Sequence, residues 1–209
     1  MSGIVRLVAR VLSHVMPRYR LATPGDIPAL RGLIEQSVRA LSAPLYSGPQ
    51  IESALRYVFG PDTQIIGDRT YYVIECDEGV LVAAGGWSRR RTLYGGDQMK
   101  GADDPLLDPN TEAARIRAFF VHPAWARRGL GRQLFERCAE DAAQAGFRNL
   151  ELVATLPGEP LYRALGFVQL ERTVATLPDG EMLPVVHMAR PLSAPPMREP
   201  NCATDPRGK

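Results

Sequence analysis

The spacing of apolar residues changes several times along the chain, and each change predicts a secondary-structure element. Apolar and polar residues alternate over Arg18–Thr23, as in a half-buried strand. From Thr23 the apolar residues recur every three or four positions and predict a helix that ends near Leu41. Thr23 suits the cap of that helix, Pro24 its first position, and Asp26 completes a capping box.

The same patterns predict the remaining elements of the chain. We expect helices at 49–59, 129–145 and 160–166, and strands at 70–76, 80–87, 113–121, 150–155, 167–177 and 184–190. Gly146 is expected to stop the second of these helices in a left-handed conformation. Helices interleaved with seven strands predict one α/β domain built on a mixed sheet.

Three segments fall outside this regular pattern. Residues 1–17 form an N-terminal extension that contains no acidic residue, so a transit peptide, a surface helix and an over-extended start are all left open. The tail, residues 192–209, is rich in Pro, Arg and Asp and is expected to be disordered. Residues 88–112 form a long polar loop of a kind that is usually functional or mobile. The predicted domain therefore spans residues 18–191.

Composition narrows the class of protein. A chain of 209 residues with 45% hydrophobic and 23% charged residues is typical of a soluble globular domain, and a net charge of +2 argues against a general nucleic-acid partner. No apolar stretch approaches the roughly 20 residues that span a bilayer, so no membrane partner is expected. Three scattered cysteines, at 76, 138 and 202, and three scattered histidines predict no metal site. They favour buried thiols in a reducing compartment, hence a cytoplasmic location.

The junction "ARRGLGR", Ala126 to Arg132, carries the candidate chemistry. A helix N-terminus exposes unpaired N–H groups and a partial positive charge, which together bind anions. Two glycines would allow close approach of a phosphate, and three arginines would add charge. The alternative is a plain corner with solvated arginines. A dinucleotide fingerprint is excluded because Leu134 stands where a third glycine is required, and no Gly-Lys-Ser/Thr of a P-loop follows.

The stretch "FFVHPAWARRGLGRQLFERC", followed by "LYRALGF", resembles the Gcn5-related N-acetyltransferase (GNAT) family. The family signature is Arg/Gln-x-x-Gly-x-Gly/Ala after a strand that ends in Val-x-Pro, with a downstream Tyr-x-x-x-Gly-Phe. This chain departs from it at the first signature position, where Ala126 stands. The resemblance implies a mostly antiparallel central sheet flanked by helices and acetyl-CoA as cosubstrate, with no metal.

The resemblance also implies roles for individual residues. Nine residues would bind the cofactor: Phe119, Phe120, Val121, Arg127, Arg128, Gly129, Leu130, Gly131 and Arg132. An N–H near Val121 would polarise the thioester carbonyl, where negative charge develops. Tyr162 matches the general acid that protonates the leaving thiolate, although it could instead only pack against the cofactor. His122 and Pro123 are expected to form a turn.

The base and the acceptor are less constrained by the sequence. Glu151 and Glu75 are candidate bases, directly or through water, or else structural carboxylates. If Arg115 and Arg117 converge with Arg89–Arg91, the acceptor carries a carboxylate or phosphate; a solvated strand face is the alternative. Tyr46 and the loop around it are expected to line the acceptor pocket.

We therefore expect an N-acetyltransferase that transfers acetyl from acetyl-CoA to a primary amine of a small molecule, directly within a ternary complex. The alternatives are a protein or peptide N-acetyltransferase, a non-catalytic acyl-CoA-binding regulatory module, and a plain α/β scaffold. Whether the protein forms a homodimer is left open.

Overall fold

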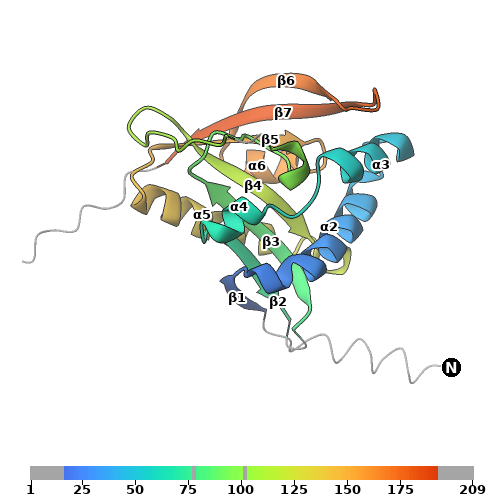
Figure 1. Ribbon diagram of the computed structural model, residues 1–209, viewed down its shortest axis with the longest axis horizontal. Coiled ribbons are helices and arrows are strands. Elements are labelled where there is room, and N and C mark those ends of the chain that lie inside the picture. Colours follow the sequence, from blue (N-terminus) through green and yellow to red (C-terminus); the bar gives the residue numbers. More distant parts are fainter. Residues whose placement is uncertain (1–16, 77–78, 101–102, 193–209) are drawn as a thin grey trace, which may run out of the picture.

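The computed structural model describes residues 17–76, 79–100 and 103–192 and contains one mixed seven-stranded sheet (Figure 1). The strand order is β1-β2-β3-β4-β5-β7-β6. The strands are β1 (Arg18–Leu21), β2 (Tyr71–Glu75), β3 (Leu81–Ser88), β4 (Ala114–Val121), β5 (Asn149–Thr155), β6 (Val168–Thr176) and β7 (Met182–Pro191). The predicted fold class is confirmed.

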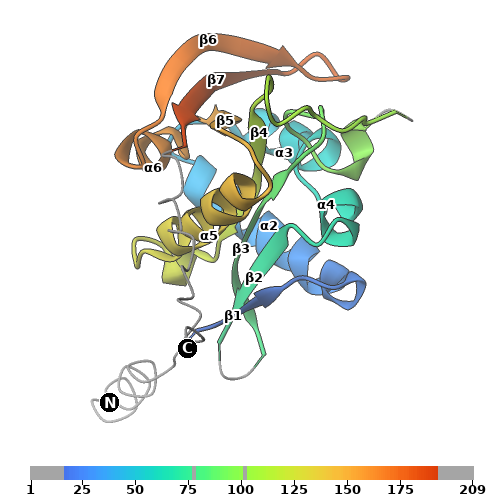
Figure 2. The same cartoon turned by 90° about the vertical axis from the view of Figure 1, so that its left-hand side faces the viewer.

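Helices cover both faces of the sheet (Figure 2). They are α2 (Ile27–Ser42), α3 (Gly48–Tyr57), α4 (Thr63–Gly67), α5 (Leu130–Gln144) and α6 (Glu159–Ala164), with short 3-10 turns η1 (Pro24–Asp26), η2 (Asp97–Met99) and η3 (Pro123–Trp125). The period-two alternation of β2 explains the two cores. Tyr72 and Ile74 pack in the cluster that contains α5, whereas Tyr71 and Val73 pack in the cluster that contains α2.

The sheet opens between its two parallel strands. Every neighbouring pair is antiparallel except β4 and β5, which pair only through Ala114 with Leu150 and Arg115 with Glu151. Beyond that point β4 keeps only β3 as its partner, and β5 continues along β7. Ala118 of β4 has φ +56°, and the register between β3 and β4 shifts beside it. This β-bulge bends the end of β4 away from β5.

Local signals in the sequence account for most element boundaries. Asp26 accepts a hydrogen bond from the backbone N–H of Thr23 (2.7 Å), as the capping box predicts, and a second one from the Thr23 hydroxyl (2.9 Å). Gly146 adopts φ +93° immediately after Ala145, the C-cap of α5, which confirms the left-handed stop. The helix α4 was not predicted. Residues 1–16 and 193–209, which hold nearly all of the predicted extension and tail, lie outside the described residues.

Within the described ranges, no helix is long and apolar enough to cross a membrane.

Candidate active site

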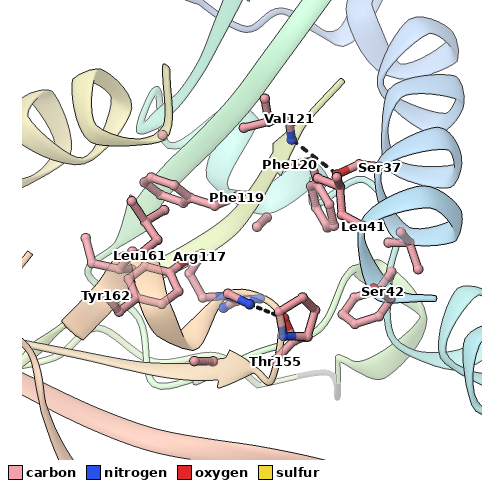
Figure 3. A pocket seen from close by; sticks show the side chains of 18 of the residues that line it. Ser37, Leu41, Ser42, Arg117, Phe119, Phe120, Val121, Thr155, Leu161 and Tyr162 are labelled. Carbon is pink, nitrogen blue, oxygen red and sulfur yellow. Dashed lines mark hydrogen bonds between the residues drawn. The ribbon is translucent and has the colours of Figure 1, made fainter. Parts of the chain in front are cut away.

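A pocket of about 530 Å³ lies where β4 and β5 separate (Figure 3). One end is formed by the loop before α5, by the first turn of that helix and by α6. The other end is formed by α2, by the segment after α3, by residues 93–96 and by β6 and β7. The last residues of β4 run between the two ends.

Gly129 and Gly131 have different structural roles at the end of the pocket formed by the glycine loop, α5 and α6. Gly129 caps α5 with φ +84°, a conformation that L side chains rarely adopt, and a Cβ placed there would meet nothing within 4 Å. A Cβ on Gly131 would lie 3.0 Å from Leu161 Cδ2, so that glycine lets α5 and α6 pack closely. The N-terminal amides of α5 therefore border open space, as an anion site requires.

The arginines of the junction divide between the pocket and the surface. Arg127 and Arg132 line the pocket, and Arg127 has φ +63°. Arg128 does not line it; its guanidinium stacks over the Trp125 ring, 4.9 Å from the centroid. Eight of the nine predicted cofactor-binding residues are thus brought together at the pocket, and Arg128 is the exception.

The end of β4 presents backbone N–H groups to two sides. The N–H of His122 donates to the Val82 carbonyl of β3 at 2.8 Å, so the N–H of Val121 points to the opposite side. There it donates to Ser37 Oγ of α2 at 3.2 Å (Figure 3). The ring of His122 accepts from the Ala124 N–H through Nδ1 at 3.2 Å, which is the turn-forming role expected for it.

The sequence analysis did not predict a role for Ser37, although its position in the apolar pattern of α2 indicates one. It lies on the buried face of α2 with Leu30, Leu33, Ile34 and Val38. A hydroxyl in such an apolar stripe needs a hydrogen-bond partner, and here that partner is an unpaired strand N–H.

Tyr162 lies across the pocket from α2 and is almost completely buried (Figure 3). Its ring packs edge-on against Phe119 and Phe167, with centroid separations of 6.2 and 5.7 Å. Burial raises the pKa of its hydroxyl above the ordinary value, with a smaller contribution from Cys138. The phenol is therefore protonated at neutral pH and available as a proton donor.

The candidate bases lie away from the pocket. Glu151 pairs with Arg115 and lies 3.4 Å from His187 Nε2, and Glu75 pairs with Arg20 at 2.9 Å. Neither carboxylate lines the pocket, and no Asp, Glu, Lys or His does so among the described residues.

The hypothesis of a convergent arginine cluster for an anionic acceptor is wrong. Arg115 is held by Glu151, and Arg90 is held by Asp68 at 2.7 Å. Arg117 lines the pocket, but its side chain is only 1% exposed and is bound to Asp62 Oδ2 at 2.9 Å. Arg90, Arg115 and Arg117 thus each have a carboxylate partner already.

Asp62 organises this region from a position that the sequence did not reveal. Its carboxylate is completely buried, contacts both Arg117 and Lys100, and caps α4 by accepting from the Ile65 N–H at 3.2 Å. Arg117 also donates to the carbonyls of Thr92 (2.6 Å) and Gly95. The pair therefore fixes residues 92–96 of the long polar loop as one side of the pocket.

Tyr46 was expected to line the pocket, but it does not. Its buried hydroxyl donates to the Pro184 carbonyl of β7 at 2.6 Å and accepts from the Leu156 N–H at 2.9 Å. It joins the α2–α3 loop to β7 and to the residue after β5.

Comparison with known proteins identifies the family. A family model described as the acetyltransferase (GNAT) domain matches residues 67–169. The chain contains a GNAT acetyltransferase domain. The matched segment includes β4, the glycine loop, α5 and Tyr162. A GNAT domain of this kind makes the protein an acyltransferase of the N-acetyltransferase type.

Solved structures share the GNAT fold at low sequence identity. A GCN5-related N-acetyltransferase from Rhodopseudomonas palustris has 21% identity and a TM-score of 0.62, over 85% of this chain and 96% of that protein. A phosphinothricin acetyltransferase from Sinorhizobium meliloti, solved with acetyl-CoA, has 21% identity and a TM-score of 0.57, over 91% and 96%. The ribosomal-protein-S18-alanine N-acetyltransferase from Escherichia coli has 18% identity and a TM-score of 0.52, over 88% and 99%. No curated protein matched the sequence.

The Sinorhizobium meliloti protein is named for a small-molecule acceptor, and the Escherichia coli protein is named for a protein acceptor. These comparisons therefore leave the acceptor of this chain undetermined. Within the part of the chain that is described, no group of three or more His, Cys, Asp or Glu side chains is placed to hold a metal ion.

Proposed function

We propose that the protein transfers the acetyl group of acetyl-CoA directly to a primary amine of a small molecule, within a ternary complex. The observation that carries this proposal is the single pocket in which the α5 N-terminus, the end of β4 and Tyr162 meet. These are the parts that the chemistry needs, since it requires an anion site, a donor to the thioester carbonyl and an acid for the leaving group.

The pocket residues fit acetyl-CoA at the first end. Open space in front of Gly129, the α5 amides, Arg127 and Arg132 suit the pyrophosphate. The N–H groups of Phe119 and Val121 lie two residues apart and so point to the same side of β4, away from β3. They suit the amide and thioester carbonyls of an extended pantetheine chain, with the Val121 N–H exchanging Ser37 Oγ for the thioester carbonyl.

The transfer step follows from these positions. The amine lone pair attacks the thioester carbonyl carbon, and backbone N–H groups of β4 stabilise the oxyanion that forms. The carbon–sulfur bond then breaks, and the sulfur takes the proton of the Tyr162 hydroxyl. Water accepts the proton that the amine loses, because no carboxylate or imidazole lines the described pocket. Solvent returns the proton to Tyr162.

Three hydrogen bonds favour a small acceptor over a polypeptide. Tyr46 binds the Pro184 carbonyl, Gln50 Nε2 binds the Met182 carbonyl at 2.6 Å, and Ser53 Oγ binds Asp179 Oδ1 at 2.6 Å. They join the α2–α3 segment to the β6–β7 hairpin, along one side of the pocket. A polypeptide crossing between these elements would have to break them, whereas a small amine would not.

Steady-state kinetics of thiol release test the proposal. With acetyl-CoA and amine both varied, a ternary complex predicts intersecting double-reciprocal lines. Tyr162→Phe should lower kcat by roughly 100-fold and leave acetyl-CoA affinity unchanged. Tyr57→Phe is the control, because Tyr57 does not line the pocket. Full activity of Tyr162→Phe would remove the acid role, and cofactor binding without any amine-dependent thiol release would favour the regulatory module.

A further inference from the structure

We infer that the acceptor is a primary amine attached to an apolar group, with no second charged group. This inference rests on the proposed function and concerns the end of the pocket that lies beyond Tyr162. It is based on the apolar side chains that form that end and on the ion pair that already holds Arg117, the charged residue nearest to it.

The acceptor end, as we name it, has an almost wholly apolar lining. Its residues come from α2 and the segment after α3, from residues 93–96, and from the β6–β7 hairpin. The side chains are Leu41, Ser42, Val58, Phe59, Leu93, Tyr94, Ala175, Leu183 and Val185. Serine and tyrosine hydroxyls are the only polar side-chain groups among them.

The charged side chains of the described pocket are arginines only. Arg127 and Arg132 belong to the glycine-loop end, beside the α5 N-terminus. Arg117 alone lies between the two ends, where β4 passes through the pocket (Figure 3). No lining residue can therefore serve as a counter-ion to a second ammonium group on the acceptor.

Arg117 is not available to bind an acceptor carboxylate. One terminal nitrogen donates to the Thr92 carbonyl, and the other donates to Asp62 and to the Gly95 carbonyl. Its side chain is 1% exposed, and burial lowers its pKa from the usual value. Asp62 and Asp97 together balance the charges of Arg117 and Lys100, so an anion beside Arg117 would gain little and would lose its hydration.

A second charge on the acceptor would thus be desolvated without a partner, whichever its sign. The reacting amine escapes this penalty because it is neutral when it attacks. An apolar substituent gains by burial against the aliphatic and aromatic lining.

Matched pairs of amines test the inference. Phenethylamine and phenylalanine differ by a carboxylate, and pentylamine and cadaverine differ by an ammonium group. We expect kcat/KM to be roughly 100-fold higher for the member of each pair without the extra charge, as burial of an unpaired charge implies. Equal values, or a preference for phenylalanine or cadaverine, would overturn the inference.

A variant can reverse one preference. Leu41→Asp adds a carboxylate to the acceptor end and should raise kcat/KM for cadaverine at least tenfold relative to pentylamine. Leu45→Asp is the control, because Leu45 is 53% exposed and does not line the pocket. An unchanged ratio in a Leu41→Asp protein that melts normally would contradict the assignment of this end to the acceptor.

Calorimetry with acetyl-CoA separates this inference from the proposed function. If the cofactor binds and charged amines are acetylated best, the acceptor class is wrong and the acetyltransferase stands. If acetyl-CoA does not bind, the proposed function fails and the acceptor class fails with it.

Discussion

Asp62→Asn should be among the most destabilising single changes in the described part of the chain. The substitution keeps the side-chain oxygen that caps α4 through the Ile65 N–H. It removes the negative charge that faces Arg117 and Lys100, and it replaces the oxygen that accepts from Arg117 with an amide N–H donor. Arg117 then loses the one carboxylate that it contacts among the described residues, and Lys100 keeps only Asp97, at 3.9 Å.

The magnitude follows from burial. Asp62 is completely buried and the Arg117 side chain is 1% exposed, so water cannot replace the lost partner. Breaking such a pair lowers the free energy of unfolding by about 3–5 kcal/mol. For a domain of this size, each kcal/mol shifts the melting temperature by about 2–4 °C, so the loss is roughly 6–20 °C.

Urea unfolding at neutral pH, followed by circular dichroism, measures that free energy by linear extrapolation. Arg117→Met should be milder, because Asp62 keeps Lys100 as a partner. The double variant Asp62→Asn/Arg117→Met should be more stable than Asp62→Asn alone, since methionine removes the buried guanidinium that Asp62→Asn leaves without its carboxylate. The amine KM should also rise in Asp62→Asn, because Arg117 fixes residues 92–96 of the pocket.

Glu52→Gln is the matched control, since it removes the charge from an exposed pair with Arg39 and should leave the unfolding curve unchanged. A loss below about 1 kcal/mol in Asp62→Asn, the range of exposed pairs, would refute the reasoning. So would a double variant less stable than Asp62→Asn.

Three further substitutions and one pH profile test the backbone strain at two glycines, the hydrogen bond of Ser37 and the acid role of Tyr162. Gly129→Ala and Gly180→Ala replace glycines with φ +84° and +89° in open space, so each should lower the unfolding free energy by about 1 kcal/mol, measured in urea. A much larger effect of either would contradict the strain argument. Ser37→Ala frees the Val121 N–H and should tighten acetyl-CoA binding about fivefold by calorimetry; weaker binding would assign Ser37 a supporting role. Burial raises the pKa of Tyr162 above 10.0, so kcat should not fall with rising pH until beyond pH 10. The same shift favours the protonated folded state, so its contribution to stability is complete below pH 10 and is lost above it, as melting curves will show.

Local signals predicted most of the fold because they act within a few residues. The Thr23–Asp26 capping box and the glycine at the end of α5 report on their own backbone, and both behave as expected. The helix α4 escaped because five residues are too few to show a helical period. Its position depends on Asp62, whose partners lie 38 and 55 residues away.

The same distinction between local and long-range contacts explains which parts of the site could be predicted. The glycine loop and the end of β4 are continuous in sequence, so the motif located them together. The acceptor end combines four separate segments, and alternation on β4 cannot show that Arg117 is already bound to Asp62. Ser37 meets Val121 across 84 residues, which no local pattern encodes.

Calorimetric titration with acetyl-CoA tests the central claim most directly. The protein should bind with micromolar affinity, and Gly129→Glu should abolish binding by placing a carboxylate before the α5 N-terminus. Gly180→Glu is the control, because Gly180 has the same left-handed backbone and open surroundings but does not line the pocket. Binding that survives Gly129→Glu unchanged, or an absence of binding by the unmodified protein, would contradict the assignment of this pocket to acetyl-CoA.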